Sequence, residues 1–144
     1  MKDQQNFAVY SQSPGQVVDA LTSILVLRDE LAADVAPQLG TNLLTAFQQR
    51  DEAQLTSQSI SLGATELQNL IPEEFRRFVS DAGGRYVLSI TLVPAADGGM
   101  RVSVTPTIIA TVGGGEGPLG GRPLPSNGTL ESSVLQAMSE RLGR

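Results

Sequence analysis

Apolar residues recur at a helical spacing through the first fifty positions. Ser13, Pro14 and Gln16 match a helix start with a capping box, in which the serine and the glutamine three residues on bond each other's backbone. Because the residue before a proline disfavours the helical conformation, we expect this helix to end near Ala36, before Pro37. Its apolar positions are Val17, Val18, Leu21, Ile24, Leu25, Leu31 and Val35.

Shorter elements flank this first helix. Phe7–Tyr10 combines apolar and β-favouring residues and fits a short edge strand. A second helix is predicted over 37–50, with Leu39, Leu43, Leu44 and Phe47 on its apolar face. Residues 51–57 are polar and are interpreted as a connection, and residues 59–62 alternate as in a short strand.

The stretch from Glu66 to Ala82 has a helical pattern interrupted at Pro72. We interpret this proline as the first position of a new helix, with Glu73 and Glu74 in its first turn. Arg77 is spaced to pair with both glutamates at the surface. Two glycines at 83–84 then predict the end of the helix.

Two long runs of alternating residues predict a β-hairpin. In residues 86–93 the even positions are apolar, and the odd positions combine valines with Ser89 and Thr91. The loop at 94–99 contains Asp-Gly, which suits a hairpin turn, and a second strand is predicted over 100–112. Pro106 lies inside that strand, so an edge position, a bulge or a bend is expected there.

Residues 113–128 are rich in glycine and proline and are interpreted as a loop, and a last helix starts near Thr129. These elements predict a single α/β or α+β domain over 1–144, with a flexible N-terminus at 1–6. Its small sheet carries the long β-hairpin of the C-terminal half, and about four helices cover one face.

Composition then excludes most catalytic chemistry. The 144 residues contain no His and no Cys, and the only lysine is Lys2. Thiolate nucleophiles, Ser-His pairs, zinc-finger ligand sets and disulfides are therefore excluded. The adjacent acids at 29–30, 51–52 and 73–74 do not converge on a helix, because neighbouring side chains point about 100° apart. We therefore expect no catalytic residues, no cofactor, no metal site and no enzyme.

Two further motifs have simpler explanations. Residues 115–120 have the G-x-G-x-x-G spacing, but no helix follows directly and three prolines remove backbone donors, so a phosphate site is not expected. Asn127-Gly128-Thr129 matches the glycosylation pattern and is interpreted as a turn followed by a helix cap.

Charge is distributed unevenly along the chain. Residues 1–75 hold three basic and ten acidic residues, a net charge of −7, whereas residues 76–144 hold seven and five, a net charge of +2. The arginines are dispersed, so nucleic acid is not expected as a partner. The polarity instead indicates head-to-tail attraction between copies, or docking to an acidic partner. No segment reaches the roughly 20 apolar residues of a membrane span, and the start has no signal peptide.

Residues 36–112 resemble a known family. Three features are similar to bacterial envelope domains. They are the helix containing Gln38-Leu39-Gly40-Thr41-Asn42, the run Phe78-Val79-Ser80-Asp81-Ala82-Gly83-Gly84-Arg85-Tyr86-Val87-Leu88, and the hairpin after that run. Examples are the N-terminal domain of TolB and the lipoproteins FlgO and CsgG. The resemblance implies a small α/β module that assembles with envelope proteins and catalyses nothing. The opening strand and Pro106 depart from the family pattern.

We therefore predict a non-enzymatic protein-interaction or assembly module that self-associates. The resemblance implies a bacterial periplasmic or envelope location if an export signal has been removed; otherwise the cytoplasm is expected. The alternatives are a small-ligand or carbohydrate-binding domain, an enzyme using dispersed carboxylates, and a cytosolic adaptor. A small-molecule ligand is less favoured than a protein partner. Predicted partner-binding residues are Pro106, Gly113, Gly114, Gly115, Arg76 and Arg77.

Overall fold

Two long antiparallel strands form the centre of the sheet in the computed structural model, which describes residues 6–95, 98–111 and 121–143. β4 (Gly84–Pro94) and β5 (Met100–Thr111) pair without interruption, from Gly84 opposite Ala110 to Pro94 opposite Met100. The connection closes with Ala95 N–H donating to the Gly99 carbonyl at 2.8 Å. The predicted hairpin is confirmed.

Four short strands complete a six-stranded, wholly antiparallel sheet. β1 (Phe7–Tyr10) and β6 (Gly121–Leu124) pair with β5, while β2 (Ala53–Thr56) and β3 (Ile60–Leu62) pair with β4. The predicted strands β1 and β3 are confirmed. Residues 51–57 were interpreted as a connection, which was wrong for residues 53–56, because they form β2. Residues 113–128 were interpreted as a loop, which was wrong for residues 121–124, because they form β6. Each of these strands has four residues, too few to establish a period in the sequence.

Pro106 occupies the gap between the two strands that pair along one side of β5. β1 pairs with residues 100–103 and β6 with residues 108–111. Val104 N–H donates to the Asn6 carbonyl at 2.8 Å, so Pro106, two residues on, directs its nitrogen toward the same side. β5 is an inner strand, but no described strand pairs with it beside Pro106, so the proline has the local setting of the predicted edge position, and the ladder to β4 contains no bulge. The sequence predicted a flexible N-terminus at residues 1–6. Residues 1–5 lie outside the described residues, and the carbonyl of Asn6 accepts the hydrogen bond from Val104.

Three long helices accompany the sheet. α1 (Pro14–Leu27) begins with the predicted capping box: Gln16 N–H donates to Ser13 Oγ at 3.3 Å, and Ser13 N–H donates to Gln16 Oε1 at 3.2 Å. α2 (Ala36–Arg50) and α4 (Thr129–Leu142) also match their predictions. α1 ends earlier than predicted, at Leu27. Asp29 has a left-handed backbone (φ +63°), which stops the helix.

The helical pattern of 66–82 yields two short elements instead of longer helices. α3 spans Ala64–Gln68, and a 3₁₀ helix, η1, spans Glu73–Phe78. Pro72 is extended (ψ 151°) and precedes η1 rather than beginning it. At the start of β4, Gly83 has φ +71°, and a Cβ there would collide with the Leu62 carbonyl oxygen. This close approach explains the glycine where the sequence predicted a helix end.

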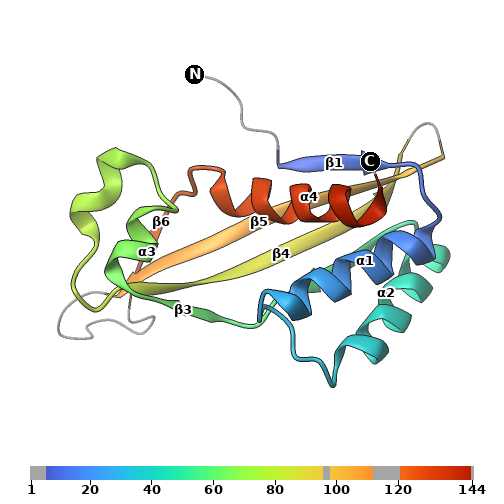
Figure 1. The fold of residues 1–144 in the computed structure, drawn as a ribbon, viewed down its shortest axis with the longest axis horizontal. Helices are drawn as coiled ribbons and strands as arrows, with labels where there is room; N and C mark the ends of the chain where they lie inside the picture. The colour runs from blue at the N-terminus through green and yellow to red at the C-terminus, as the bar shows by residue number, and fades with distance from the viewer. Residues whose placement is uncertain (1–5, 96–97, 112–120, 144) are drawn as a thin grey trace.

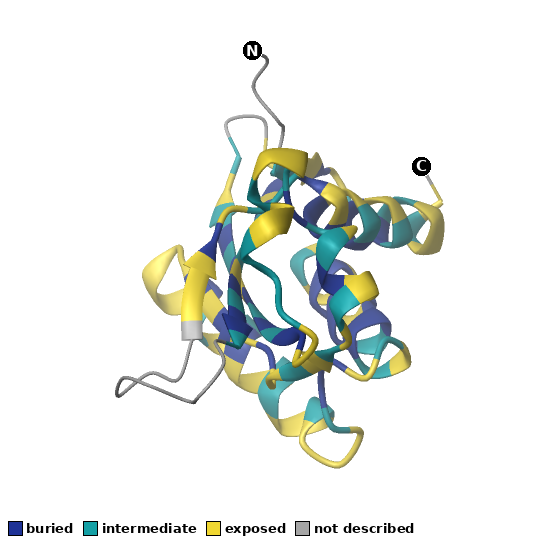
Figure 2. Ribbon diagram, turned by 90° about the vertical axis from the view of Figure 1, so that its left-hand side faces the viewer, coloured by how far each residue is buried: buried dark blue, intermediate teal, exposed yellow. Residues whose placement is uncertain are grey.

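The fold is mixed α+β, with the helices gathered on one side of the sheet (Figures 1 and 2). The even-numbered residues of β4 from Gly84 to Leu92 face the helices and are buried, whereas the odd-numbered residues face away. One hydrophobic core joins the helices to this covered face, and it includes Leu21, Leu25, Leu88, Ile90, Leu92, Val102, Val104, Val134 and Met138. The predicted covering of one face is confirmed, with three long and two short helices in place of about four.

Candidate functional site

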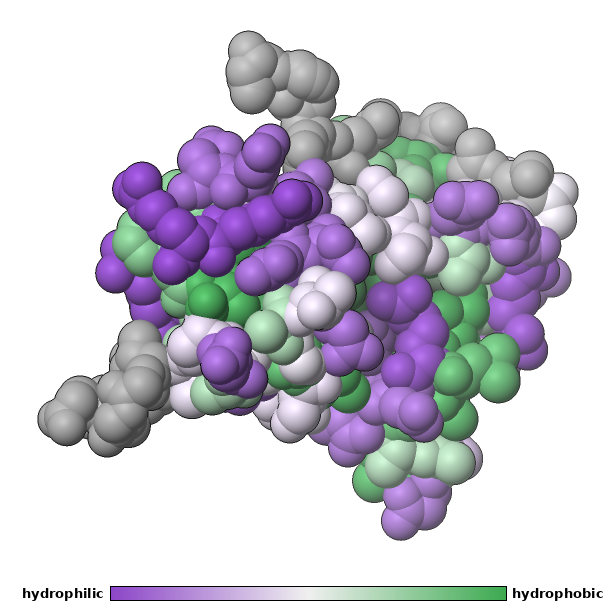
Figure 3. Space-filling view, turned by 60° about the vertical axis from the view of Figure 1, so that its left-hand side comes forward, coloured by the Kyte–Doolittle hydropathy of each residue, from purple (hydrophilic) through white to green (hydrophobic). Residues whose placement is uncertain are grey.

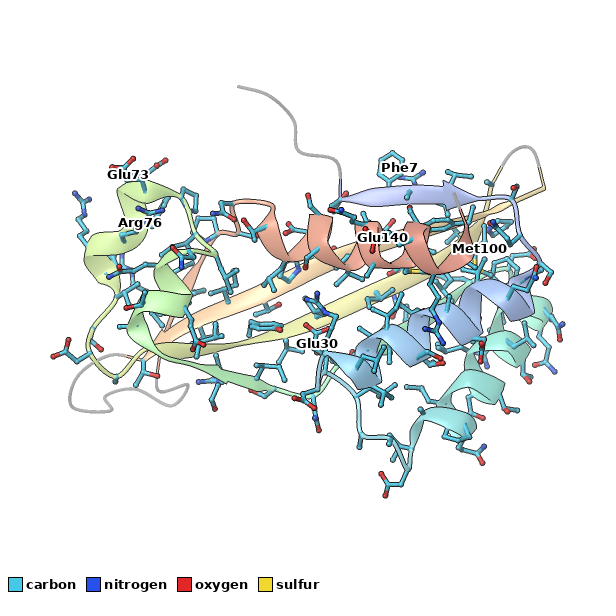
Figure 4. All side chains as sticks on the ribbon, viewed as in Figure 1. Phe7, Glu30, Glu73, Arg76, Met100 and Glu140 are labelled. Atoms are coloured by element: carbon cyan, nitrogen blue, oxygen red, sulfur yellow. The ribbon has the colours of Figure 1, made fainter. Side chains whose placement is uncertain are left out.

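A buried polar cluster lies between the covered face of the sheet and helices α1 and α4. The Glu30 side chain is completely buried, and Arg28 binds both of its oxygens, with Nε to Oε1 at 2.7 Å and a terminal nitrogen to Oε2 at 3.0 Å. Tyr86 of β4 donates its hydroxyl to Glu30 Oε2 at 2.5 Å. Arg28 also donates to Ser133 Oγ of α4 at 3.0 Å. Figure 4 shows Glu30 in the interior, between these elements.

The chain reaches this position because α1 stops early. Glu30 N–H donates to the Leu25 carbonyl at 2.8 Å, which holds the turn through Asp29 against the helix end. Gln58 fastens the same turn from outside, since its backbone N–H donates to the Glu30 carbonyl at 3.0 Å and its side chain to the Asp29 carbonyl at 2.9 Å. The turn therefore directs the Glu30 side chain inward, where Tyr86 meets it.

The electrostatics of the cluster favour a fixed charge pair. Burial disfavours the charge of Arg28, but hydrogen bonding to Glu30 and its negative charge outweigh this and raise the pKa of Arg28. Burial, followed by the hydrogen bond to Glu30, raises the pKa of Tyr86 well above its ordinary value of about 10. Both Glu30 oxygens are engaged by neighbouring side chains. The arrangement anchors α1 to β4 and α4.

The second candidate is the face of the sheet that points away from the helices, here called the open face. Its residues are the odd positions of β4 and β5 with their neighbours on the outer strands, and they are largely hydroxyl-bearing or aliphatic. Across the described strands, Arg85 and Arg101 are its only charged residues. The open face comprises Phe7, Val9, Gln54, Thr56, Ser61, Arg85, Val87, Ser89, Thr91, Val93, Arg101, Ser103, Thr105, Thr107, Ile109, Thr111 and Pro123.

Cross-strand pairs order the open face into rows. Ser89 lies between Thr56 of β2 and Thr105 of β5, and in the next row Thr91 pairs with Ser103. At the β1 end, the Arg101 guanidinium lies 4.2 Å from the centre of the Phe7 ring, a cation–π contact. The sequence already separated valines, Ser89 and Thr91 from the core side of β4, and the structure confirms that division. The role of Phe7 was not predicted from the sequence.

Exposed large hydrophobic side chains concentrate at two places. Within the described residues they are Val9 on β1, Leu27 at the end of α1 and Val35 before α2. A groove of about 570 Å³ includes Leu27 in its lining, and one of about 590 Å³ includes Val35. In Figure 3, hydrophobic side chains reach the surface over the α1–α2 end, at lower right, whereas strongly hydrophilic ones cover the η1 end.

The predicted partner-binding residues do not form one site. Pro106 lies mid-strand in β5, whereas Arg76 and Arg77 lie on η1, at one end of the molecule (Figures 1 and 4). Arg76 Nε donates to the Gln68 carbonyl at 3.0 Å, and the Arg77 guanidinium lies 4.9 Å from the centre of the Phe78 ring. Gly113, Gly114 and Gly115 lie outside the described residues, as does the glycine motif at 115–120.

Other residues selected from the sequence have structural roles. The expected pairs of Glu73 and Glu74 with Arg77 do not form among the described residues; the Arg77 guanidinium lies over the Phe78 ring instead. Asn127 Nδ2 donates to the Asn69 carbonyl at 3.0 Å, and Asn127 Oδ1 accepts from Thr129 N–H at 3.0 Å. These bonds explain Asn127 as the turn residue that was predicted.

Within residues 6–95, 98–111 and 121–143, no group of three or more His, Cys, Asp or Glu residues is placed to hold a metal ion. In the same ranges, no helix combines the length and apolar character that a membrane crossing requires. No family model, curated protein or solved structure matches the chain. The similarity to bacterial envelope domains therefore stays a prediction.

Proposed function

We propose that this protein is a non-enzymatic assembly module that binds a second copy of itself through the open face of its sheet. The observation that carries the proposal is the composition of that face. An antiparallel sheet can leave one face in water, and such faces ordinarily carry charged and long polar side chains. Here aliphatic residues and short hydroxyls dominate, with Arg85 and Arg101 as the charges.

Such a face costs little entropy to bury. Ser, Thr and Val lose less rotamer freedom on burial than Lys, Glu or Arg, so more of the contact energy remains available for association. The β4–β5 hairpin extends over eleven paired positions. A stable protein interface buries about 800 Å² on each partner, and a face of long strands is suited to that scale.

Charge complementarity favours a second copy as the occupant. The two charges of the open face are positive, whereas the segment from α1 to the C-cap of α2 exposes Asp19, Asp29, Asp34 and Asp51 against Arg50. The open face of one copy and the α1–α2 layer of the next therefore attract each other. The attraction follows from the uneven distribution of charge along the sequence, and added salt should weaken the attraction by screening the charges.

The cell envelope of a bacterium is the setting that we propose for this assembly, on the basis of the sequence resemblance. The genomic region upstream of Met1 tests it. A signal peptide followed by a lipobox cysteine supports an envelope location, and an immediately preceding stop codon in the same frame contradicts it.

Sedimentation velocity over a concentration series tests self-association. We expect the average mass of the wild-type protein to rise with concentration. Thr105→Lys, in the centre of the open face, should raise the dissociation constant at least tenfold, a loss of about 1.4 kcal/mol of binding free energy. Thr65→Lys, an exposed threonine on α3, is the matched control and should associate like the wild type. A wild-type protein that stays monomeric throughout the series contradicts the proposal, as does unchanged association of Thr105→Lys.

A further inference from the structure

The exposed large hydrophobic residues divide into two patches on opposite edges of the molecule. Val9 on β1 is 37% exposed, while Leu27 and Val35, which flank the α1–α2 connection, are 76% and 46% exposed. In Figure 1, β1 forms the upper edge and the α1–α2 connection the lower edge. One copy therefore cannot cover one patch with the other.

The first patch, here called the β1 patch, consists of Phe7, Val9 and Arg101. Phe7 and Val9 point to the open face from the edge strand, and Arg101 stands directly across from Val9 on β5. The Arg101 guanidinium lies 4.2 Å from the centre of the Phe7 ring. This contact holds a positive charge over an apolar surface, in a geometry that a carboxylate can approach from outside.

The second patch, here called the α1–α2 patch, consists of Leu27, Val35, Asp19 and Asp34. Leu27 and Asp19 line the groove of about 570 Å³, together with Val26, Ala36, Pro37 and Arg141. Val35 and Asp34 line the neighbouring groove of about 590 Å³, whose floor includes Leu31 and Leu39. The patch thus presents apolar hollows beside carboxylates, with Arg141 at one side.

The two patches complement each other in chemical character. The β1 patch offers an aromatic ring, a valine and a cation on an outer strand, and the α1–α2 patch offers apolar grooves with two acids. Contact would remove the exposed large hydrophobic residues of the described chain from water at both ends, which the hydrophobic effect favours.

We infer that the β1 patch of one copy docks into the α1–α2 patch of the next, so that copies associate head to tail. The inference rests on the proposed function and names the two surfaces that meet. Because different surfaces meet, the interface is heterologous, and the assembly grows into a ring or an open chain according to the rotation between copies. Two identical open faces meeting about a two-fold axis would instead bring two positively charged faces together, with no acid on the described strands of either.

A mixing experiment tests this pairing. Val9→Glu places a carboxylate in the β1 patch, and Leu27→Glu places one in the α1–α2 patch, while each variant keeps its other patch intact. Each variant alone should require at least tenfold higher concentration to associate than the wild type. An equimolar mixture should form a 1:1 heterodimer with one intact interface, and it should grow no further.

Controls separate this inference from the proposed function. Circular dichroism melts of both variants establish that they fold. The pair Arg101→Glu with Asp34→Arg tests the charges: each variant alone places like charges in its interface and should associate weakly, whereas the mixture pairs opposite charges at both contacts and should assemble. A wild-type protein that associates while both variants associate equally well overturns the head-to-tail pairing and leaves self-assembly standing. A mixture that stays monomeric while the wild type assembles also overturns it. A monomeric wild type removes self-assembly itself.

Discussion

Two arginines lie near aromatic side chains on opposite faces of the same sheet, and their surroundings differ completely. Arg28 lies on the covered face, where it binds the buried Glu30 in a bidentate pair that Tyr86 completes. Arg101 lies on the open face, where its guanidinium rests on the Phe7 ring and the residue stays exposed. A charge taken out of water needs every partner supplied by the fold, whereas a charge at the surface remains available to another molecule.

The largest expected effect is the loss of the buried anchor. Glu30→Ala leaves the Arg28 guanidinium, a quarter exposed, without its counter-charge and the Tyr86 hydroxyl without its acceptor. We expect the free energy of unfolding to fall by about 4 kcal/mol, measured by urea denaturation. Glu140→Ala on the exposed side of α4 is the control, with a change within about 0.5 kcal/mol. A loss below about 1 kcal/mol for Glu30→Ala would show that the cluster does not anchor the fold.

Substitutions of two neighbouring residues of β4 compare how much each face of the sheet contributes to stability. Leu88 is completely buried on the covered face, so Leu88→Ala creates a cavity and should cost about 3 kcal/mol in the same denaturation experiment. Val87 is partly exposed on the open face, and Val87→Ala should cost below about 1 kcal/mol. Equal costs would mean that the open face is packed as tightly as the core.

A smaller effect concerns alkaline pH. The folded protein holds Tyr86 protonated beyond its ordinary pKa of about 10, so above that pH only the unfolded chain releases this proton. The stability that Tyr86 contributes is therefore complete below pH 10 and falls above it, by up to about 1.4 kcal/mol per pH unit.

Tyr86→Phe tests this dependence. The variant should lose about 1.5 kcal/mol at pH 7, because the hydrogen bond to the Glu30 carboxylate disappears. Its stability should decline less steeply than that of the wild type between pH 10 and 11 in urea titrations. Parallel declines of the two proteins would assign the alkaline loss to other groups.

Local signals made the long elements predictable. The capping box at Ser13 and Gln16 depends on residues three apart, and the alternation of β4 and β5 extends over many positions, so neighbouring residues specify both. The short strands β2 and β6 lack such a signal, because a four-residue segment becomes a strand only when a partner strand completes its hydrogen bonds. The turn after α1 likewise involves distant residues, since Tyr86 of β4 bonds the Glu30 side chain and Gln58 bonds the Asp29 and Glu30 carbonyls.

Some features of the open face were also predictable from the sequence, and others were not. The sequence separated the hydroxyl-bearing and aliphatic side of β4 from its core side, because the period of two is local. It did not associate Phe7 with Arg101 or Val9 with the same arginine, since these contacts depend on the pairing of β1 with β5. The fold also places Pro106 on β5 and Arg76 and Arg77 on η1, so these predicted partner-binding residues do not lie together.

The sequence by itself determined the covered and open sides of the hairpin, the start of α1, the last helix and the absence of histidine and cysteine chemistry. Each of these depends on composition or on residues a few positions apart. Only the tertiary structure decided that Glu30 turns inward to Tyr86, that Pro106 lies in a gap between two short strands, and that Val9 and Leu27 emerge on opposite edges. These features join residues that the chain separates widely, and no local pattern encodes which distant segments will pair.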